Sequence, residues 1–258
     1  MFCKYTNDLI YIIFTVNMTI KKHIPNAITC CNLFCGCLAI VAAFAGNLVL
    51  TVYLVALALI FDFFDGFAAR MLRVVSPIGK DLDSLADMVT FGVVPGIVMY
   101  KLILISIENY TVNGQLVPTY IAYLGFIITI FSAIRLAKFN NDTRQTTSFI
   151  GVPTPANAIL ICSIPLILQT NSLPFIINPF VLITMSFILS FLLISEIPLF
   201  ALKFKSFGWQ GNRIRFIFIG LSILLLIILQ FIAIPLIIIL YVLISLITQF
   251  YMKQKMER

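Results

Sequence analysis

Apolar runs of about 20 residues recur along the whole chain, separated by short stretches that carry most of its charged residues. A helix of about 20 apolar residues is long enough to cross the hydrocarbon core of a bilayer. The pattern therefore predicts an all-α fold, a polytopic transmembrane bundle of about eight spans. The predicted spans are residues 26–45, 49–71, 82–104, 118–138, 155–170, 178–201, 214–231 and 233–251.

Two places in this pattern are irregular. The last two spans are separated only by Gln230 to Pro235, so we expect a tight turn there, with Pro235 as the helix breaker. The sixth span contains Glu196, and a carboxylate is costly inside a membrane. Either that helix ends before Glu196, or Glu196 has a partner.

The first 17 residues fit no span. The apolar run Leu9–Ile20 contains only 12 residues, which is too short to cross a bilayer. We expect this segment to be either an interfacial helix or an extension upstream of a true start at Met18. The sequence shows no soluble linker, so residues 1–258 are expected to form one membrane-embedded domain.

Composition and charge indicate where the protein lies. Hydrophobic residues make up 61% of the chain and charged residues 10%, which excludes an ordinary soluble protein. The net charge of +7 comes from Lys and Arg at the ends of apolar runs, which indicates topology and anionic lipid contact and not nucleic-acid binding. We therefore expect an integral protein of a bacterial inner membrane, with both termini cytoplasmic, loop 74–80 inside and loop 105–117 outside.

Acidic residues are concentrated in one place. Five of the ten lie between Asp62 and Asp87, and four keep helical spacing, with Asp62 and Asp65 at i, i+3 and Asp83 and Asp87 at i, i+4. An Asp at the bilayer centre costs about 3 kcal/mol, so something must compensate this cluster. Divalent cations such as Mg²⁺, Mn²⁺ or Ca²⁺ suit carboxylate oxygens. Because loop 74–80 turns the chain back, the two pairs are expected to face each other across antiparallel helices.

The pattern is typical of a two-metal site for phosphoryl transfer. Metal ions would neutralise a diphosphate, and a carboxylate near them could take a proton from an alcohol. Gly66 and Ala69 leave room for a ligand beside the helix, and Arg70 offers a planar fork for phosphate. The alternative class is an ion-coupled transporter, which would spread its acids over several helices instead of two consecutive helix ends.

The whole segment reads Asp-x2-Asp-Gly-x2-Ala-Arg-x8-Gly-x3-Asp-x3-Asp, which resembles the signature of the CDP-alcohol phosphatidyltransferase family. All eight signature positions match: Asp62, Asp65, Gly66, Ala69, Arg70, Gly79, Asp83 and Asp87. The resemblance implies a membrane-embedded, usually dimeric enzyme that transfers the phosphatidyl group of CDP-diacylglycerol to an alcohol and releases CMP. It also implies that the four Asp residues hold two divalent cations, Mg²⁺ or Mn²⁺, and that Asp87 is the general base. The CDP moiety would be bound by Asp62, Gly66, Ala69, Arg70 and Gly79.

The flanking sequence resembles the phosphatidylserine synthase branch of this family, in residues 24–26, 32–36, 83–95, 135–140 and 151–157. This resemblance implies L-serine as the acceptor, but glycerol 3-phosphate or an inositol phosphate stays open as the alternative. It gives Arg135 and Lys138 a phosphate- or serine-binding role. Lys138 replaces an expected Arg, which puts a bidentate phosphate contact in doubt. Asn26, which follows Pro25, is expected to be a helix N-cap.

Overall fold

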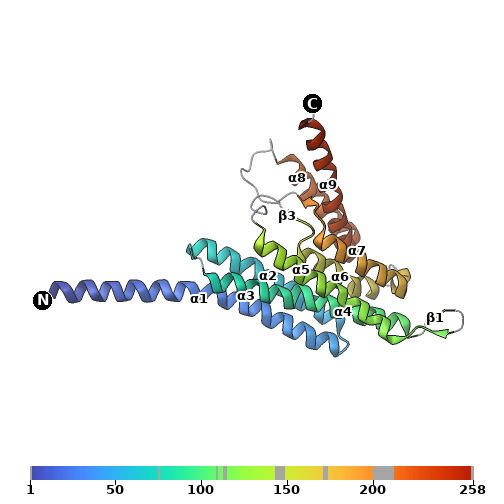
Figure 1. Ribbon diagram of the computed structural model, residues 1–258, viewed down its shortest axis with the longest axis horizontal. Helices are drawn as coiled ribbons and strands as arrows, with labels where there is room; N and C mark the ends of the chain where they lie inside the picture. The colour runs from blue at the N-terminus through green and yellow to red at the C-terminus, as the bar shows by residue number, and fades with distance from the viewer. Residues whose placement is uncertain are drawn as a thin grey trace.

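The computed structural model describes residues 2–74, 76–108, 110–112, 115–142, 149–170, 174–199 and 212–256. It is a helical bundle with two very short antiparallel β-ladders (Figure 1). In chain order the helices are α1 (Phe2–Phe44), α2 (Leu48–Leu72), α3 (Pro77–Asp87), the π-helix η1 (Met88–Val93), α4 (Val94–Ile107), the 3₁₀ segment η2 (Thr119–Phe126), α5 (Ile127–Asn141), α6 (Thr154–Gln169), η3 (Pro174–Ile177), α7 (Pro179–Ile194), α8 (Arg213–Leu229), η4 (Gln230–Ile232) and α9 (Ala233–Met256). The ladders pair β1 (Thr111–Val112) with β2 (Gln115–Leu116), and β3 (Phe149–Ile150) with β4 (Pro198–Leu199).

The all-α prediction is confirmed, and the protein has the helices of an integral membrane protein. Within the described ranges, five helical segments are long and apolar enough to cross a membrane: His23–Phe44, Leu48–Leu72, Pro77–Ile107, Thr119–Asn141 and Arg213–Thr248. The last of these contains α8 and most of α9, and the apolar helices α6 and α7 are shorter. Apart from α1 and α7, the helices lie close to the predicted apolar runs, because run length and helix length are set by the same hydrophobic segment.

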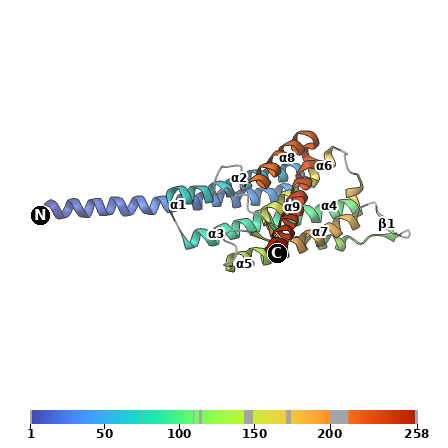
Figure 2. The same cartoon turned by 90° about the horizontal axis from the view of Figure 1, so that it is seen from above.

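The N-terminal helix differs from the prediction. Helix α1 runs unbroken from Phe2 to Phe44 with Pro25 inside it, and its first half projects beyond the bundle (Figures 1 and 2). Asn26 therefore lies within the helix, and the prediction that it is an N-cap is wrong. A proline inside a helix removes one backbone hydrogen bond, and α1 nevertheless continues on both sides of Pro25.

The turn between α2 and α3 is closed by local backbone features. Arg73 ends α2 in the left-handed conformation, with φ +53°, and its N–H contacts carbonyls of the last helical turn. The Ser76 hydroxyl then caps α3 by accepting a hydrogen bond from the Gly79 N–H, and Pro77 occupies the first helical turn. This turn brings the C-terminal end of α2 and the N-terminal end of α3 together, at the end of the bundle from which α1 projects (Figure 1).

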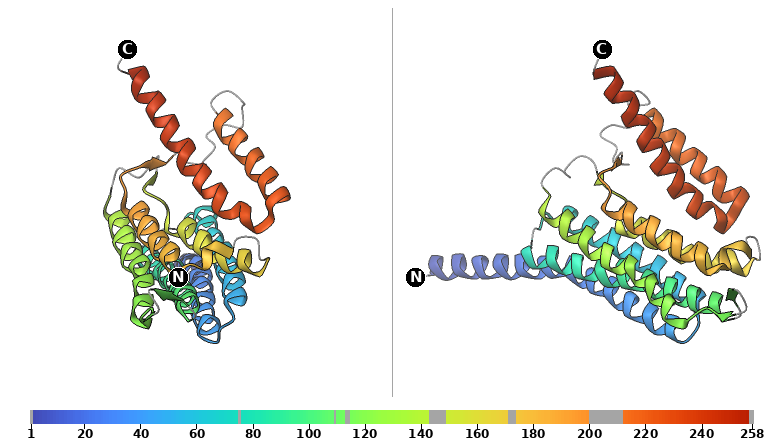
Figure 3. Two further views of the ribbon diagram at one scale, coloured as in Figure 1. Left: turned by 90° about the vertical axis from the view of Figure 1, so that its right-hand side faces the viewer. Right: turned by 45° about the vertical axis from the view of Figure 1, so that its right-hand side comes forward.

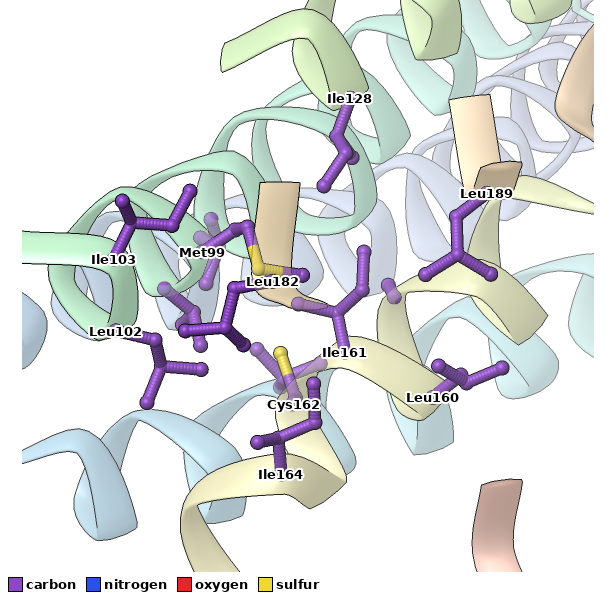
Figure 4. Packing of buried hydrophobic residues seen from close by; sticks show 14 of the residues in the cluster. Met99, Leu102, Ile103, Ile128, Leu160, Ile161, Cys162, Ile164, Leu182 and Leu189 are labelled. Carbon is purple, nitrogen blue, oxygen red and sulfur yellow. The ribbon is translucent and has the colours of Figure 1, made fainter. Parts of the chain in front are cut away.

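The core lies where α4 and α6 meet, with α5 and α7 packed on them. Met99 and Ile103 of α4 and Ile161 of α6 are fully buried there (Figure 4). Cys162 and Leu182 fill the space between these helices. Such packing fixes α4, and α4 continues η1 and α3 without a break, so the core determines where the acidic residues of α3 lie.

Helix α7 is shorter than the predicted span 178–201. It ends at Ile194, so Glu196 lies after the helix and is not buried within it. The chain beyond α7 pairs with β3 instead, where Gly151 has φ +74° and its Cα lies close to the Leu193 and Ser195 carbonyls. The first of the two readings of Glu196, an early helix end, is confirmed.

Helices α8 and α9 form an antiparallel hairpin that is inclined to the other helices (Figure 3). The tight turn expected between them is present, but Pro235 does not make it. The break is at Gln230, which has φ +49° and ends α8, while Pro235 lies in the first turn of α9. Proline is tolerated there because first-turn N–H groups have no partner within the helix.

Candidate active site

Three carboxylates from two helices meet at one point. Asp62 of α2 and Asp83 and Asp87 of α3 each offer an oxygen, and these oxygens lie within 4.8 Å of one another. The i, i+4 spacing puts Asp83 and Asp87 on one face of α3, from which both carboxylates reach Asp62 of α2. All three side chains are half-buried. Negative groups this close repel one another, and carboxylate oxygens are the ligands that hard divalent cations prefer, so the donor set fits a metal ion.

Asp65, the fourth signature carboxylate, lies beside this group and not within it. It is buried and accepts a hydrogen bond of 2.7 Å from the Thr29 hydroxyl of α1. The Thr29 hydroxyl has a single proton, for which the Pro25 carbonyl is a competing acceptor at the longer distance of 3.1 Å. The structure therefore brings three of the four predicted ligands together directly, and holds the fourth one helical turn away.

A cavity of about 290 Å³ opens next to the acidic cluster. Asp65 and Asp83 line it on one side, and the signature residues Gly66, Ala69 and Gly79 form part of its wall. The other lining residues are Pro25, Asn26, Thr29, Val74, Ser76 and Lys80. Small residues in the wall keep the space open, which is what a ligand that approaches the backbone requires.

Two further signature residues, Gly79 and Arg70, lie close to neighbouring side chains or to other signature residues. A Cβ at Gly79 would lie 2.8 Å from the Asn26 Oδ1 atom, so a larger residue there would require the Asn26 side chain to move. Arg70 is exposed, and its guanidinium reaches back toward Gly66, where a Cβ would be 3.5 Å from Nη1. Arg70 thus lies beside Gly66, which lines the cavity.

Helix α1 supplies a polar face that the sequence analysis did not include among the site residues. Asn26 contacts the α3 start, Thr29 bonds Asp65, and the Asn32 side-chain amide donates to Asp87 Oδ1 at 3.4 Å. The three residues are spaced at i, i+3 and i+6 in the mostly apolar part of α1 that follows His23, so they share one face. The spacing in the sequence could have predicted this polar face, but it does not predict which helix the face packs against.

Asn32 is held against the π-helix that follows Asp87. The Thr90 hydroxyl donates to the Asn32 carbonyl at 3.3 Å. One helical turn along α1, a Cβ at Gly36 would overlap the Thr90 hydroxyl and lie 3.2 Å from its Cα. Glycine at this position therefore lets α1 and η1 approach closely enough for Asn32 to reach Asp87.

The basic residues proposed for the acceptor lie on α5. Arg135 is buried, with its guanidinium 5.1 Å from the centre of the Phe139 ring and its Nε atom without a hydrogen-bond partner. Lys138 is exposed. Neither residue lines the cavity beside the acidic cluster. Nearer the end of α5, Asn140 contacts α3 through Ser84 and Lys80.

This arrangement has the parts for divalent-cation binding next to a ligand cavity. The half-buried carboxylates can hold the cations, and the adjoining cavity can take a charged group that the cations neutralise. A carboxylate at the edge of the cluster, such as Asp87, can also accept a proton.

Comparison with known proteins agrees with this chemistry. Residues 22–194 match the family model for CDP-alcohol phosphatidyltransferase. The chain is 35% identical over 176 residues to the CDP-diacylglycerol–serine O-phosphatidyltransferase of Bacillus subtilis, which covers 68% of this chain and 89% of that protein. It is 33% identical over 205 residues to the enzyme of the same name from Helicobacter pylori, with coverage of 77% and 80%. An archaetidylserine synthase of Methanothermobacter thermautotrophicus is 31% identical over 142 residues, with coverage of 54% and 56%.

Proposed function

Because the chain belongs to the CDP-alcohol phosphatidyltransferase family, we propose that it transfers the phosphatidyl group of CDP-diacylglycerol to the hydroxyl of L-serine. The products are phosphatidylserine and CMP. The observation that carries the proposal is the meeting of Asp62, Asp83 and Asp87 at one point, in the signature spacing of that family. The serine acceptor is supported by the bacterial relatives, whose names include serine, and by the archaeal archaetidylserine synthase.

The reaction is a direct displacement at phosphorus. The serine oxygen bonds to the β-phosphorus of CDP-diacylglycerol while the bond from that phosphorus to the CMP oxygen breaks, and the electron pair leaves with CMP. The hydroxyl proton passes to Asp87, which we propose as the general base because it is half-buried at the α1 side of the cluster, where its carboxylate contacts both the Asn32 amide and Asp62. No covalent phosphatidyl-enzyme is required.

Asp62, Asp65, Asp83 and Asp87 are proposed to hold two divalent cations, Mg²⁺ or Mn²⁺. When bound, such cations neutralise the diphosphate and stabilise the charge that develops on the departing CMP. Asp65 serves this role through its fixed orientation, because the Thr29 hydroxyl occupies one side of its carboxylate. One oxygen each of Asp62, Asp83 and Asp87 lies within 4.8 Å of the other two, which is close enough for one cation to contact all three.

The CDP moiety is proposed to occupy the cavity next to the cluster, against Gly66, Ala69 and Gly79. Asp62 and Arg70 complete this site, the first through the cations and the second through its exposed guanidinium. The diacylglycerol chains would then extend along the apolar surface of the bundle into membrane lipid.

An acceptor that carries a phosphate, such as glycerol 3-phosphate or an inositol phosphate, is the alternative within the family. Such an acceptor needs a dense basic pocket, and the candidates are Arg135, Lys138 and Arg144, of which Arg144 lies outside the described residues. The exposure of Lys138 supports the smaller acceptor, because a cation in open solvent adds little to binding. Arg135 remains the proposed contact for the serine carboxylate. The transporter alternative is weaker, because a family of transferases matches residues 22–194.

We also propose eight membrane spans with both termini in the cytoplasm, and the active site at the cytoplasmic face of a bacterial inner membrane. The strong Lys and Arg asymmetry between the two sides of the predicted topology supports this orientation. A homodimer is proposed from the family resemblance.

The function is tested by measuring CMP release from CDP-diacylglycerol in membranes that contain the protein. L-serine, glycerol 3-phosphate, myo-inositol 1-phosphate and ethanolamine are supplied one at a time. We expect CMP and phosphatidylserine with L-serine only. Release of CMP with a phosphorylated alcohol and not with L-serine would contradict the proposed acceptor, and no release with any alcohol would contradict the activity.

A further inference from the structure

In the side-chain amide of Asn32, the nitrogen has a hydrogen-bond partner and the oxygen has none. Its side chain is completely buried, and Nδ2 donates to Asp87 Oδ1 at 3.4 Å. Its Oδ1 atom is also buried but has no hydrogen-bond partner. An ionised carboxylate only accepts hydrogen bonds, so the amide must present its nitrogen to Asp87. The amide oxygen then points away from the Asp87 oxygen that the nitrogen contacts. A buried carbonyl oxygen without a donor costs free energy that an incoming donor would recover.

The contacts around Asn32 keep the amide in this place. Thr90 holds the Asn32 main chain, and Gly36 allows the close approach of α1 to η1. Asn32 is completely buried and neither it nor Asp87 lines the cavity, so the Oδ1 atom meets an acceptor only when that acceptor enters as far as Asp87. Because Nδ2 of the same amide bonds Asp87, an acceptor whose hydroxyl contacts this carboxylate would bring its neighbouring groups close to the unpaired oxygen.

Among the polar groups of an amino alcohol such as serine, only one suits this oxygen. The hydroxyl is engaged with Asp87, a carboxylate cannot donate, and the ammonium donates three hydrogen bonds. The ammonium and the hydroxyl lie on adjacent carbons, so they can contact two neighbouring acceptors at once. Resting on the proposed function, we propose that Asn32 Oδ1 binds the ammonium group of the acceptor and makes Asn32 a specificity-determining residue for amino alcohols.

The proposal is tested by comparing L-serine with 3-hydroxypropanoate, which has the same hydroxyl and carboxylate but no ammonium. The KM for L-serine and the inhibition constant of 3-hydroxypropanoate against L-serine are measured for the wild type, Asn32→Leu and Asn32→Asp. In the wild type we expect L-serine to bind about 10- to 100-fold more tightly, the value of one charge-assisted hydrogen bond. In Asn32→Leu this ratio should fall to about one, with the KM for CDP-diacylglycerol unchanged. Asn32→Asp keeps an acceptor oxygen and should keep the preference for L-serine, even if kcat falls.

Thr51→Val is the matched control, because Thr51 is a buried polar residue of the α1–α2 interface that bonds Ala39 and Asn47 at the opposite end of the helices. It should leave the ratio as in the wild type. If Asn32→Leu lowers kcat but keeps the wild-type ratio, Asn32 only positions Asp87 and the proposal is wrong. If the wild type itself does not use L-serine, the proposed function fails first, and the Asn32 role fails with it.

Discussion

The side-chain amide of Asn140 donates a hydrogen bond to the Ser84 hydroxyl, 2.8 Å away, and so ties the end of α5 to α3. Ser84 lies between the site residues Asp83 and Asp87, and Asn140 ends the stretch that begins at Arg135. The two residues are separated by 56 positions in the chain. Lys80 adds a second contact, because its Nζ donates to the Asn140 carbonyl at 3.2 Å. Residues 83–95 and 135–140 both resemble the phosphatidylserine synthase branch of the family, and these two segments are therefore in direct contact beside the acidic cluster.

Removal of this hydrogen bond should loosen α3 beside the site. We expect Ser84→Ala and Asn140→Ala each to destabilise the protein by about 1 kcal/mol, the usual net value of one such bond. The double variant should lose little more than either single variant, because both changes remove one shared interaction. Thermal unfolding in detergent measures this double-mutant cycle. Strictly additive losses would show that the two side chains do not interact.

Metal dependence should be absolute. Three carboxylates within 4.8 Å of one another need positive charge between them, so chelation with EDTA should abolish CMP release and Mg²⁺ or Mn²⁺ should restore it. Asp62→Asn removes one donor and should raise the dissociation constant for Mn²⁺ by at least about tenfold, since even indirect partners of a metal contribute that much. Direct Mn²⁺ binding, followed by electron paramagnetic resonance, measures it. Full turnover in a metal-free preparation would contradict the metal site.

Asp87 is expected to matter for proton transfer more than for nucleotide binding. Asp87→Asn should reduce kcat about 10²–10⁴-fold, the usual contribution of a general base, while binding of CDP-diacylglycerol survives in part. Asp81→Asn is the matched control, because Asp81 is an exposed residue of the same helix outside the cluster. Its activity should equal that of the wild type. Near-normal turnover of Asp87→Asn would make the base assignment wrong, and loss of both metal and nucleotide binding would make Asp87 chiefly a metal ligand.

Gly36 should tolerate no side chain. A Cβ there would overlap the Thr90 hydroxyl, so Gly36→Ala must push η1 away from α1 and break the contacts of Asn32 with Thr90 and Asp87. Overpacking of this kind typically costs about 1–3 kcal/mol, and we expect both a lower unfolding temperature and a lower kcat. Gly220→Ala is the control, because nothing lies within 4 Å of a Cβ at that position. Equal behaviour of the two variants would show that α1 and η1 are not closely packed.

The proposed orientation predicts opposite labelling of two single cysteines. In a background that lacks the six native cysteines, Ser76→Cys should react with a membrane-impermeant thiol reagent only from the cytoplasmic side. Asn113→Cys, in a loop position outside the described residues, should react only from the other side. Reaction of both from one side would mean that the number of spans between them is wrong.

The sequence alone determined the helical class, the approximate ends of the apolar helices and the two faces that carry the acidic pairs. These properties are local, because the length of an apolar run sets the helix length and the i, i+3 and i, i+4 spacings set the face. The same local rules failed at Asn26 and at the C-terminal end of the predicted span 178–201. Pro25 is accommodated within α1, and α7 ends early because the following residues pair with β3.

Only the tertiary structure decided which side chains complete the site. Thr29 is 36 positions from Asp65, and Asn32 is 55 positions from Asp87, so their contacts depend on how α1 packs against α2 and η1. An amphipathic spacing identifies a polar face but not its partner, because many helix pairings bury the same face. The close approach that Gly36 permits selects one of them, and that selection places an unpaired amide oxygen next to Asp87.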